Sequence, residues 1–324
     1  MPDPDAMVLP QELLIAGAAV RVGLFDALKE GPHTLEELAS RTRCDMRALW
    51  NVTEALVALG YLEHVGGRVG LTREARSMLY DPESESYTGF SFMHTWNLIP
   101  RWMALPEIMR TGKPAPREDD PEESKDFIAA MSHYAGEGAA RIAEHCLKGL
   151  PKEAKVLDVG GGPLTIATAF AKQGAGVTVL DLPEVIDMMA PQADPGLRID
   201  MVKGDFTEWL PEGPFDLVYL GNVCHIYGEE ENRKLFAACA KVLRQGGRLV
   251  INDFIRGTSQ RADVFAVNML VNTESGGTWT YPNPSPSAAH CSGLFGGWPR
   301  GEGGRAVPPS AAGSGGWWLF RQVL

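Results

Sequence analysis

Apolar residues in the first eighty positions recur mainly at helical spacing. Over residues 7–28 they lie three or four positions apart, at Leu9, Leu13, Ala16, Val20, Leu24 and Leu28. This spacing predicts a helical segment with one buried face. The small residues at 17–19 would let another helix approach it closely.

Two further helices are predicted, beginning at Thr34 and at Asp45. Thr34 followed by Glu37 matches a capping box, and Asp45 is an N-cap residue in front of the second periodic stretch. A hairpin with a Gly-Gly turn follows at 61–72. Helices followed by a hairpin predict a winged helix, which we place at residues 7–80.

Residues 81–150 are expected to be mostly helical, with a polar, proline-containing loop at 111–124. The segment 89–109 is rich in Phe, Met, Trp and His. Packing of a core explains such a segment, and so does the lining of an apolar ligand pocket. We therefore assign residues 81–150 to a helical linker and substrate-lining region.

From Pro151 onward, short apolar runs alternate with helical segments. The runs that predict strands are at 155–160, 177–181, 199–206, 215–223 and 247–255. Alternating strands and helices are typical of an α/β fold with a doubly wound, Rossmann-like parallel sheet. We place this second domain at residues 151–281.

The pattern breaks at about Pro282. Residues 282–324 hold 9 glycines and 6 prolines, and they show no helical or strand periodicity apart from the last apolar residues. One hypothesis is a shifted reading frame beyond codon 281. The other is a flexible Gly/Pro/Ser tail that evolved as such.

Composition narrows the classes of function. Lys and Arg number 30 against 41 Asp and Glu, a net charge of −11, which disfavours binding to nucleic acid or to an anionic membrane. Arg41, Arg43 and Arg47 lie near the candidate recognition helix, so DNA binding stays an alternative to a dimerisation role for the winged helix.

Localisation and metal content follow from what the chain lacks. No apolar run approaches the roughly 20 residues that a membrane span needs, and the N-terminus lacks the layout of a signal peptide. The five cysteines form no CxxC pair and the histidines form no cluster. We therefore expect a cytoplasmic protein without a metal site.

The segment 156–170 carries the most informative motif. Gly160 and Gly162 lie between a strand and a helix, where the backbone turns sharply and a ligand comes close. Thr165 stands where a dinucleotide fingerprint has its third glycine, and no Gly-Lys-Ser/Thr of a P-loop follows. Pro163 removes a donor that a pyrophosphate would use. The turn therefore suits a nucleoside without phosphates.

Acidic residues also end the next two strands. Asp181 lies 21 residues after Gly160, a spacing suited to accepting hydrogen bonds from ribose hydroxyls, although a helix cap is its other interpretation. Asp205 is placed to accept from an exocyclic amine, and Phe206 to cover a purine face. The three positions should converge at the carboxyl edge of the sheet.

The segments LDVGGGP, VTVLDLPEV, KGDF, GNVCHIYGEEENRKLF and RQGGRLVINDFI occur in this order. Over residues 7–281 the chain resembles the S-adenosylmethionine-dependent O-methyltransferases of the plant caffeate and bacterial antibiotic-biosynthesis type. The resemblance implies a homodimer formed through a winged-helix domain, and a class I methyltransferase domain. The cofactor-binding residues that it implies are Asp158, Gly160, Gly161, Gly162, Asp181, Leu182, Asp205, Phe206, Asn222 and Tyr227.

His225 falls where this family has its general base. It also follows the fourth predicted strand, and an imidazole suits the removal of a hydroxyl proton during attack on a sulfonium methyl group. A purely structural histidine is the alternative. Met131 resembles a substrate-lining position of the family, and His94 and Trp96 are further candidates for substrate binding.

The chain departs from the family pattern at specific places. Leu164 replaces the last glycine of the family's GGGPG turn, and Ile226 replaces the aspartate that follows the histidine in plant members. Trp279 stands where the family has a glutamate that orients the histidine, so the nearest acid, Glu274, becomes the candidate catalytic partner of His225. The atypical tail implies that the C-terminal strands of the sheet are missing or replaced.

The leading prediction is a cytoplasmic, homodimeric enzyme that transfers a methyl group from S-adenosylmethionine to a hydroxyl of a small, aromatic metabolite. Its alternatives are a cofactor-binding protein without methyl transfer and a winged-helix regulator that senses a ligand. Methylation of nitrogen or carbon stays open.

Overall fold

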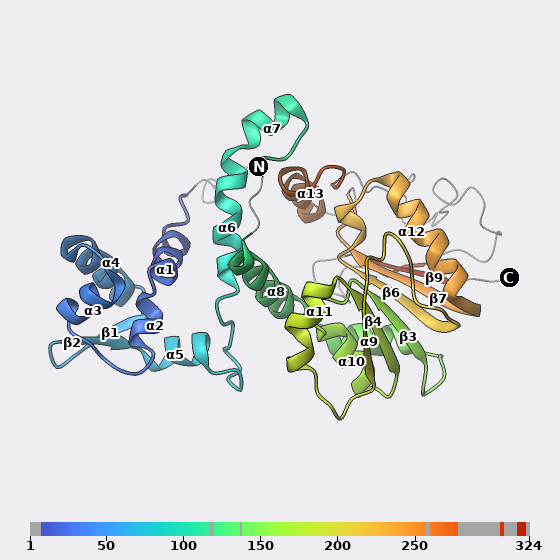
Figure 1. The fold of residues 1–324 in the computed structure, drawn as a ribbon, viewed down its shortest axis with the longest axis horizontal. Helices are drawn as coiled ribbons and strands as arrows, with labels where there is room; N and C mark the ends of the chain where they lie inside the picture. Colours follow the sequence, from blue (N-terminus) through green and yellow to red (C-terminus); the bar gives the residue numbers. More distant parts are fainter. Residues whose placement is uncertain are drawn as a thin grey trace. The chain divides into compact units, whose positions relative to one another are not determined.

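The chain divides into two compact units, each with a core of its own. The computed structural model describes residues 8–116, 120–136, 138–256, 260–277, 305–307 and 316–321, the last two ranges by their backbone alone. The first unit holds residues 1–99 and 120–133, and the second holds 100–119 and 134–324 (Figure 1).

The first unit combines helices with a two-stranded hairpin. Its helices are α1 (Gln11–Arg21), α2 (Leu24–Leu28), α3 (Leu35–Thr42), α4 (Met46–Ala58), α5 (Arg73–Tyr80), the first part of α6 (Phe92–Met103) and most of α8 (Pro121–Gly136). Strands β1 (Leu62–Val65) and β2 (Arg68–Leu71) pair antiparallel around the Gly66-Gly67 turn. The helices and hairpin that the sequence predicts are therefore present.

Side-chain caps begin the helices α3 and α4 as predicted. Thr34 and Glu37 form a complete capping box, each side chain bonding the other's backbone N–H. Asp45 accepts a hydrogen bond from the Ala48 N–H at 2.9 Å. These bonds satisfy backbone donors that the first helical turn leaves unpaired.

Close contact between α1 and α6 confirms the expectation drawn from the small residues of α1. A Cβ atom on Gly17 would lie 2.2 Å from Cε3 of Trp96, so only glycine leaves room for the indole. Nearby, Arg21 donates to Asn97 and to Asp126 of α8. Asn97 in turn donates to Asp126 at 2.8 Å, and this polar network ties α1, α6 and α8 together.

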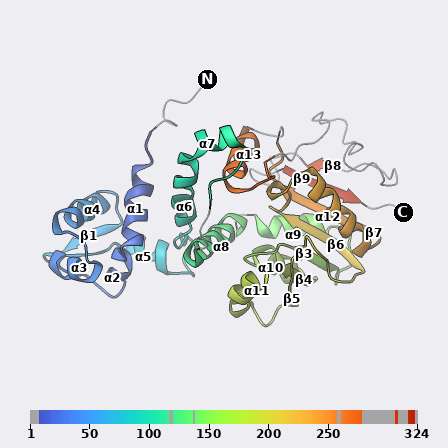
Figure 2. The same cartoon turned by 45° about the horizontal axis from the view of Figure 1, so that its top comes forward.

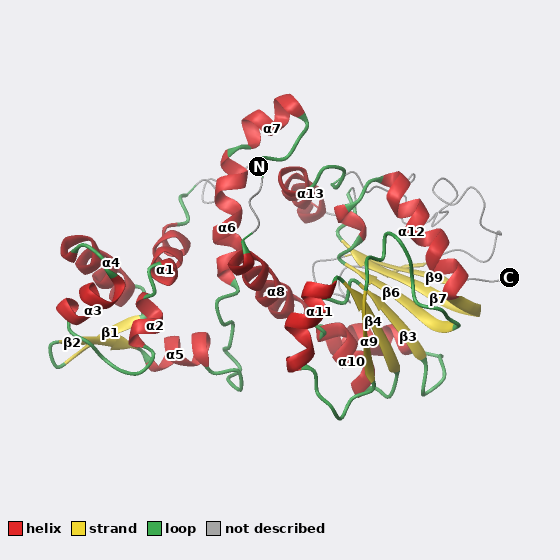
Figure 3. Cartoon of the chain, viewed as in Figure 1, coloured by secondary structure: helices red, strands yellow, loops and turns green. Residues whose placement is uncertain are grey.

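The second unit is built around one sheet with helices alongside it (Figure 3). The strands are β3 (Lys155–Val159), β4 (Gly176–Asp181), β5 (Ile199–Lys203), β6 (Phe215–Gly221), β7 (Leu243–Asp253), β8 (Arg305–Val307) and β9 (Gly316–Arg321). Their order is β5-β4-β3-β6-β7-β9-β8, and the first five run parallel. The predicted parallel, doubly wound sheet is confirmed.

The helices of the second unit precede, connect or follow these strands. They are α7 (Leu105–Thr111), α9 (Ala139–Leu147), α10 (Thr165–Lys172), α11 (Pro183–Met189), α12 (Glu229–Val242) and α13 (Gln260–Asn272), with the 3₁₀ turns η2 (Ala190–Gln192) and η3 (Cys224–Ile226). The strand order reverses at β3, because β4 lies on one side of it and β6 on the other. Ligands of doubly wound sheets bind at this kind of reversal, at the carboxyl ends of the strands.

The atypical tail supplies two strands to the far edge of the sheet. β9 pairs antiparallel with β7, and β8 pairs with β9 (Figure 2). The edge at which the C-terminal strands were expected to be missing or replaced is therefore occupied by backbone from the tail. Trp279 and the sequence break at Pro282 lie outside the described residues.

Within the described ranges, no helix has the length and apolar character required to cross a membrane.

Candidate active site

Three glycines form the turn between β3 and α10. Gly160 has a φ of +67°, and a Cβ there would lie 3.0 Å from Cγ2 of Val223. A Cβ on Gly161 would lie 2.7 Å from Cγ1 of Val179. At Gly162 the added atom would meet only the Gly160 carbonyl oxygen, at 3.9 Å. The turn is therefore packed tightly at its start and open at Gly162.

Leu164 ends this turn in a left-handed conformation. Its φ is +61°, it precedes the first residue of α10, and its side chain is buried. Glycine adopts this backbone without strain, whereas a residue with a Cβ does so at a cost. Leu164 therefore adopts the left-handed backbone conformation that suits the glycine of the family's turn, and its side chain fills part of the core.

Two buried carboxylates lie at the ends of β3 and β4. Asp181 accepts hydrogen bonds from the N–H of Gly162 at 2.7 Å and of Leu182 at 2.8 Å, one on each oxygen. Burial raises the pKa of Asp181, and the two backbone donors act in the opposite direction. Asp158 is completely buried, and burial together with the charge of Asp181 raises its pKa to about 7. Its Oδ2 has no hydrogen-bond partner among the described residues.

Three of the residues predicted to bind the cofactor, Asp205, Phe206 and Tyr227, lie close together. Phe206 and Tyr227 meet edge to face, with ring centroids 5.9 Å apart. Burial, followed by the charges of Asp205 and Asp181, raises the pKa of Tyr227. Oδ1 of Asp205 accepts from the N–H and the hydroxyl of Thr207, at 2.8 and 2.6 Å, which holds this carboxylate beside the two rings.

His225 lies on the turn η3, which follows β6. Its Nδ1 is 2.5 Å from Oδ1 of Asp253, the last residue of β7. The Asp253 carboxylate also accepts from the backbone N–H groups of Cys224 (2.8 Å), His225 (3.2 Å) and Phe254 (2.6 Å). Both side chains are buried, so a fully hydrogen-bonded carboxylate orients the imidazole.

Glu274, the acid expected to pair with His225, does not occupy this position. It lies after α13 and is exposed, whereas Nδ1 of His225 already pairs with Asp253. Asp253 pairs with His225 because of the order of the strands in the sheet. β6 and β7 are parallel neighbours, with Gly221 opposite Asn252, so the residues that follow each strand meet at one edge of the sheet.

The sequence carries a signal for Asp253 but does not show its partner. It lies near the carboxyl end of a predicted strand, as Asp158 and Asp181 do, and acids near these ends converge where the parallel strands are neighbours. Asn222 also lies at this edge. It has a φ of +57°, which asparagine tolerates better than most residues, and its N–H donates to the carbonyl of Asn252 at 2.9 Å.

The comparisons with known proteins agree with this geometry. A model of the O-methyltransferase domain matches residues 112–279, more than half of the chain. The chain belongs to the O-methyltransferase family. It is 30% identical over 275 residues to 3-hydroxy-5-methyl-1-naphthoate 3-O-methyltransferase of Streptomyces sahachiroi, covering 79% of each protein.

Two other relatives broaden this comparison. The N,N-dimethyltransferase OxyT of Streptomyces rimosus is 29% identical over 259 residues, 74% of this chain and 73% of that protein. PigF of Serratia sp. is an S-adenosyl-L-methionine-dependent methyl transferase. The solved structure of PigF with SAH has a TM-score of 0.74 and 21% identity, and covers 96% of both chains. The predicted family, fold class, methyltransferase activity and S-adenosylmethionine cofactor are confirmed.

The three residues predicted to bind substrate belong to the first unit of this O-methyltransferase. His94 on α6 meets Phe127 of α8 edge to face, with centroids 5.3 Å apart. Trp96 packs on Gly17, and Met131 is half-buried on α8. Each therefore has a packing contact or partial burial within its own unit, and their role toward substrate stays a prediction.

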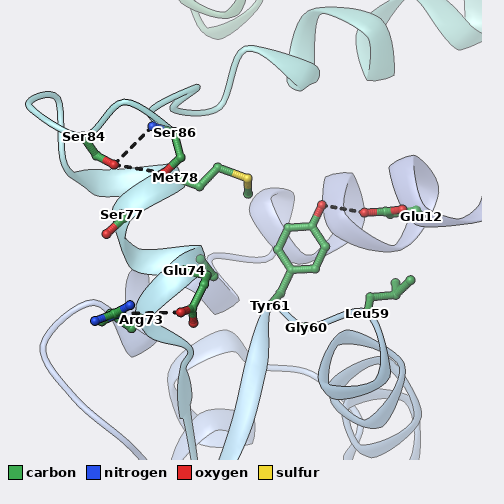
Figure 4. Close-up of a pocket in the computed structure, with 11 residues that line it drawn as sticks. Glu12, Leu59, Gly60, Tyr61, Arg73, Glu74, Ser77, Met78, Ser84 and Ser86 are labelled. Carbon is green, nitrogen blue, oxygen red and sulfur yellow. Dashed lines mark hydrogen bonds and ion pairs between the residues drawn. The ribbon is translucent and has the colours of Figure 1, made fainter.

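A pocket of about 630 Å³ opens in the first unit between α1, the start of β1, and α5 with the loop that follows it (Figure 4). The hydroxyl of Tyr61 donates to Glu12 across it at 2.9 Å, and burial with this carboxylate raises the pKa of Tyr61 to about 12. None of the residues predicted for catalysis or cofactor binding lines this pocket.

Among the described residues, no group of three or more His, Cys, Asp or Glu side chains could hold a metal ion.

Proposed function

We propose that this O-methyltransferase methylates a hydroxyl group of a small aromatic metabolite, with His225 as the general base. The pairing of Nδ1 of His225 with Oδ1 of Asp253 carries the proposal. An ionised carboxylate only accepts hydrogen bonds, so Asp253 holds the proton of the neutral imidazole on Nδ1. The lone pair then lies on Nε2, the atom available to an acceptor hydroxyl.

The residues at the carboxyl edge fit S-adenosylmethionine. The opening at Gly162 suits its methionine end, and so does the buried Oδ2 of Asp158, which no described residue hydrogen-bonds. Each carboxylate oxygen of Asp181 holds one backbone donor and has a further lone pair for a ribose hydroxyl. Gly160, Gly161, Leu182, Asp205, Phe206, Asn222 and Tyr227 complete the proposed cofactor site.

The chain's own residues move the proton. The cofactor supplies a methyl group made electrophilic by a sulfonium. Nε2 of His225 would take the hydroxyl proton as the acceptor oxygen bonds to that methyl carbon and the carbon–sulfur bond breaks, its electron pair staying on the sulfur of the demethylated product. The imidazolium that results is stabilised by Asp253, whose position is set by three backbone donors. The proton returns to solvent when the methylated product leaves.

An aromatic acceptor fits the side chains around the imidazole. Phe265 of α13 lies edge-on to His225, with centroids 4.9 Å apart, and stacks on Phe254 at 4.2 Å. The relative that acts on a hydroxynaphthoate supports a fused-ring phenol as the substrate class. OxyT supports a nitrogen acceptor as the second candidate. His94, Trp96 and Met131 are proposed to contact the acceptor.

The same resemblance supports proposals about assembly. We propose a cytoplasmic homodimer that forms through the winged helix at residues 7–80 and binds neither nucleic acid nor membrane. The net charge of −11 supports the last point, because it repels phosphate-rich surfaces. Residues 81–150, 151–281 and 282–324 are proposed as the substrate-lining region, the cofactor domain and the atypical tail.

Methyl transfer and cofactor binding can be tested separately. We expect S-adenosylmethionine to bind in titration calorimetry and a 3-hydroxy-1-naphthoate to be methylated, with transfer followed by mass spectrometry. His225→Ala should retain cofactor affinity and lose roughly 10²-fold or more in kcat. Unchanged turnover in this variant would remove His225 from the mechanism. Methylation of an arylamine but of no phenol would favour the second candidate.

A further inference from the structure

The backbone of the turn that carries His225 is held on its carbonyl side as well as on its amide side. Nδ2 of Asn232 donates to the carbonyl oxygens of Cys224 at 2.9 Å and Tyr227 at 3.2 Å. The N–H of Gly277 donates to the carbonyl oxygen of His225 at 3.0 Å. These carbonyls span η3, so the turn is anchored along its whole length.

Asn232 is an unusual choice for its place in the fold. It is completely buried on α12, on a helix that also buries Leu235, Phe236 and Cys239. Its Oδ1 has no hydrogen-bond partner among the described residues. A buried amide with an unpaired oxygen is less favourable than an apolar side chain of similar size, and asparagine is a poorer helix former than leucine. What an asparagine supplies here, and an apolar side chain would not, is the pair of hydrogen bonds from its Nδ2 to the carbonyls of η3 and its C-cap.

We propose that Asn232 is a positioning residue for His225, an inference that rests on the proposed function. A single 3₁₀ turn has weak hydrogen bonds of its own. Asp253 holds the N–H groups of the turn and pairs with the imidazole, while Asn232 holds the carbonyls on either side of it. With both in place, the His225 backbone cannot rotate without breaking a buried hydrogen bond, so Nδ1 stays on Asp253 and Nε2 stays available to the acceptor.

The two side chains that hold η3, Asn232 and Asp253, come from different elements. Asn232 reaches η3 from α12, and Asp253 reaches it from the end of β7. Removal of the amide leaves the Asp253 pair chemically intact and frees the carbonyls of Cys224 and Tyr227, while the N–H of Gly277 still holds the carbonyl of His225. The expected consequence is a base that spends less time in its reactive orientation, while Asp181 of the cofactor site keeps its two backbone hydrogen bonds, which do not involve Asn232.

The first test is kinetic. Asn232→Leu keeps the branch at Cγ and the number of side-chain heavy atoms, and leucine is a good helix former, so we expect a folded protein. Its kcat should fall roughly 10–100-fold with a 3-hydroxy-1-naphthoate as acceptor, while KM for S-adenosylmethionine changes less than about threefold. Cys239→Ala is the matched control, because Cys239 is buried two turns further along α12. An equal fall in kcat for the control would overturn the proposal.

The second test needs no acceptor. Protein labelled with ¹⁵N at histidine should show a downfield Nδ1 proton that disappears in His225→Ala and so reports the bond to Asp253. We expect this signal to be lost or broadened in Asn232→Leu. The same result is expected for Asn232→Asp, which replaces the leucine variant in this test if the latter does not fold. An unchanged signal in a folded variant overturns the proposal, whatever its kcat. If wild-type protein transfers no methyl group, the proposed function fails, while this signal still decides the role of Asn232.

Discussion

Asp158 and Asp181 lie near the carboxyl ends of neighbouring strands, and the charge of Asp181 adds to burial in raising the pKa of Asp158 to about 7. Two carboxylates thus lie under the glycine turn without a cation among the described residues to separate them. A cofactor with a sulfonium and an ammonium group supplies positive charge, so this pair favours its binding.

Replacement of Asp158 by asparagine should stabilise the cofactor-free protein at high pH. The folded-state pKa of Asp158 is raised, from 3.8 to about 7, so the folded protein binds more protons than the unfolded chain between these values. Its stability therefore falls as pH rises from about 4 to 7 and stays low above that. Asp158→Asn removes this loss, so the free energy of unfolding of the variant should exceed that of wild type by up to about 4 kcal/mol at pH 8.

The measurement is urea unfolding at pH 5 and pH 8. Asp200→Asn is the control, because Asp200 lies exposed on β5, and it should give the same difference from wild type at both values. A gain for Asp158→Asn that does not grow with pH would contradict the prediction.

Loss of the carboxylate at Asp253 should slow methyl transfer more than it weakens cofactor binding. The carboxamide of Asp253→Asn presents an N–H where the ring or backbone donors need an acceptor, so His225 loses its fixed tautomer. We expect kcat to fall roughly 100-fold, with S-adenosylmethionine affinity within about threefold by calorimetry. Glu274→Gln should leave kcat unchanged, and a larger effect at Glu274 than at Asp253 would restore the acid expected from the sequence.

Substitutions at Leu164 separate backbone strain from burial. Leu164→Ala loses a buried side chain and should destabilise the protein by about 2–4 kcal/mol. Leu164→Gly loses the same atoms but relieves the left-handed φ of +61°, so it should be more stable than the alanine variant by about 1 kcal/mol. Thermal unfolding should rank wild type as the most stable, then the glycine variant, then the alanine variant. An alanine variant as stable as the glycine variant would argue against strain at Leu164.

The contact of Gly17 with Trp96 predicts that a better helix former will destabilise α1. Alanine at Gly17 gains up to about 1 kcal/mol of helix propensity, but its Cβ would lie 2.2 Å from the indole. Such overpacking costs about 1–3 kcal/mol, so Gly17→Ala should have a lower melting temperature than wild type.

Two further variants check the cause. Gly136→Ala, at the end of α8 with nothing within 4 Å of the added Cβ, should not lower the melting temperature. Trp96→Leu in the Gly17→Ala background should show a favourable coupling energy in a double-mutant cycle. Additive effects would show that the indole is not the obstacle.

The sequence alone determined the elements whose signals are local. Apolar spacing placed the helices and the five parallel strands, cap residues marked where α3 and α4 begin, and the glycine turn located the cofactor loop with Asp158 and Asp181. His225 stood out because it follows a strand at that edge. Each of these signals lies within a few residues of the chain, and backbone geometry converts such spacing directly into a helix, a strand or a turn.

Only the tertiary structure decided which groups hold His225. Glu274 was the expected partner because of a family pattern near the break in the tail, yet Asp253, 28 residues from His225, occupies the place, and Asn232 reaches the turn from α12. Local periodicity does not reveal which strands are neighbours in the sheet, or which residues of a helix contact a distant turn. The pairing of β6 with β7 and the packing of α12 supply that information, since they bring together side chains that the sequence keeps apart.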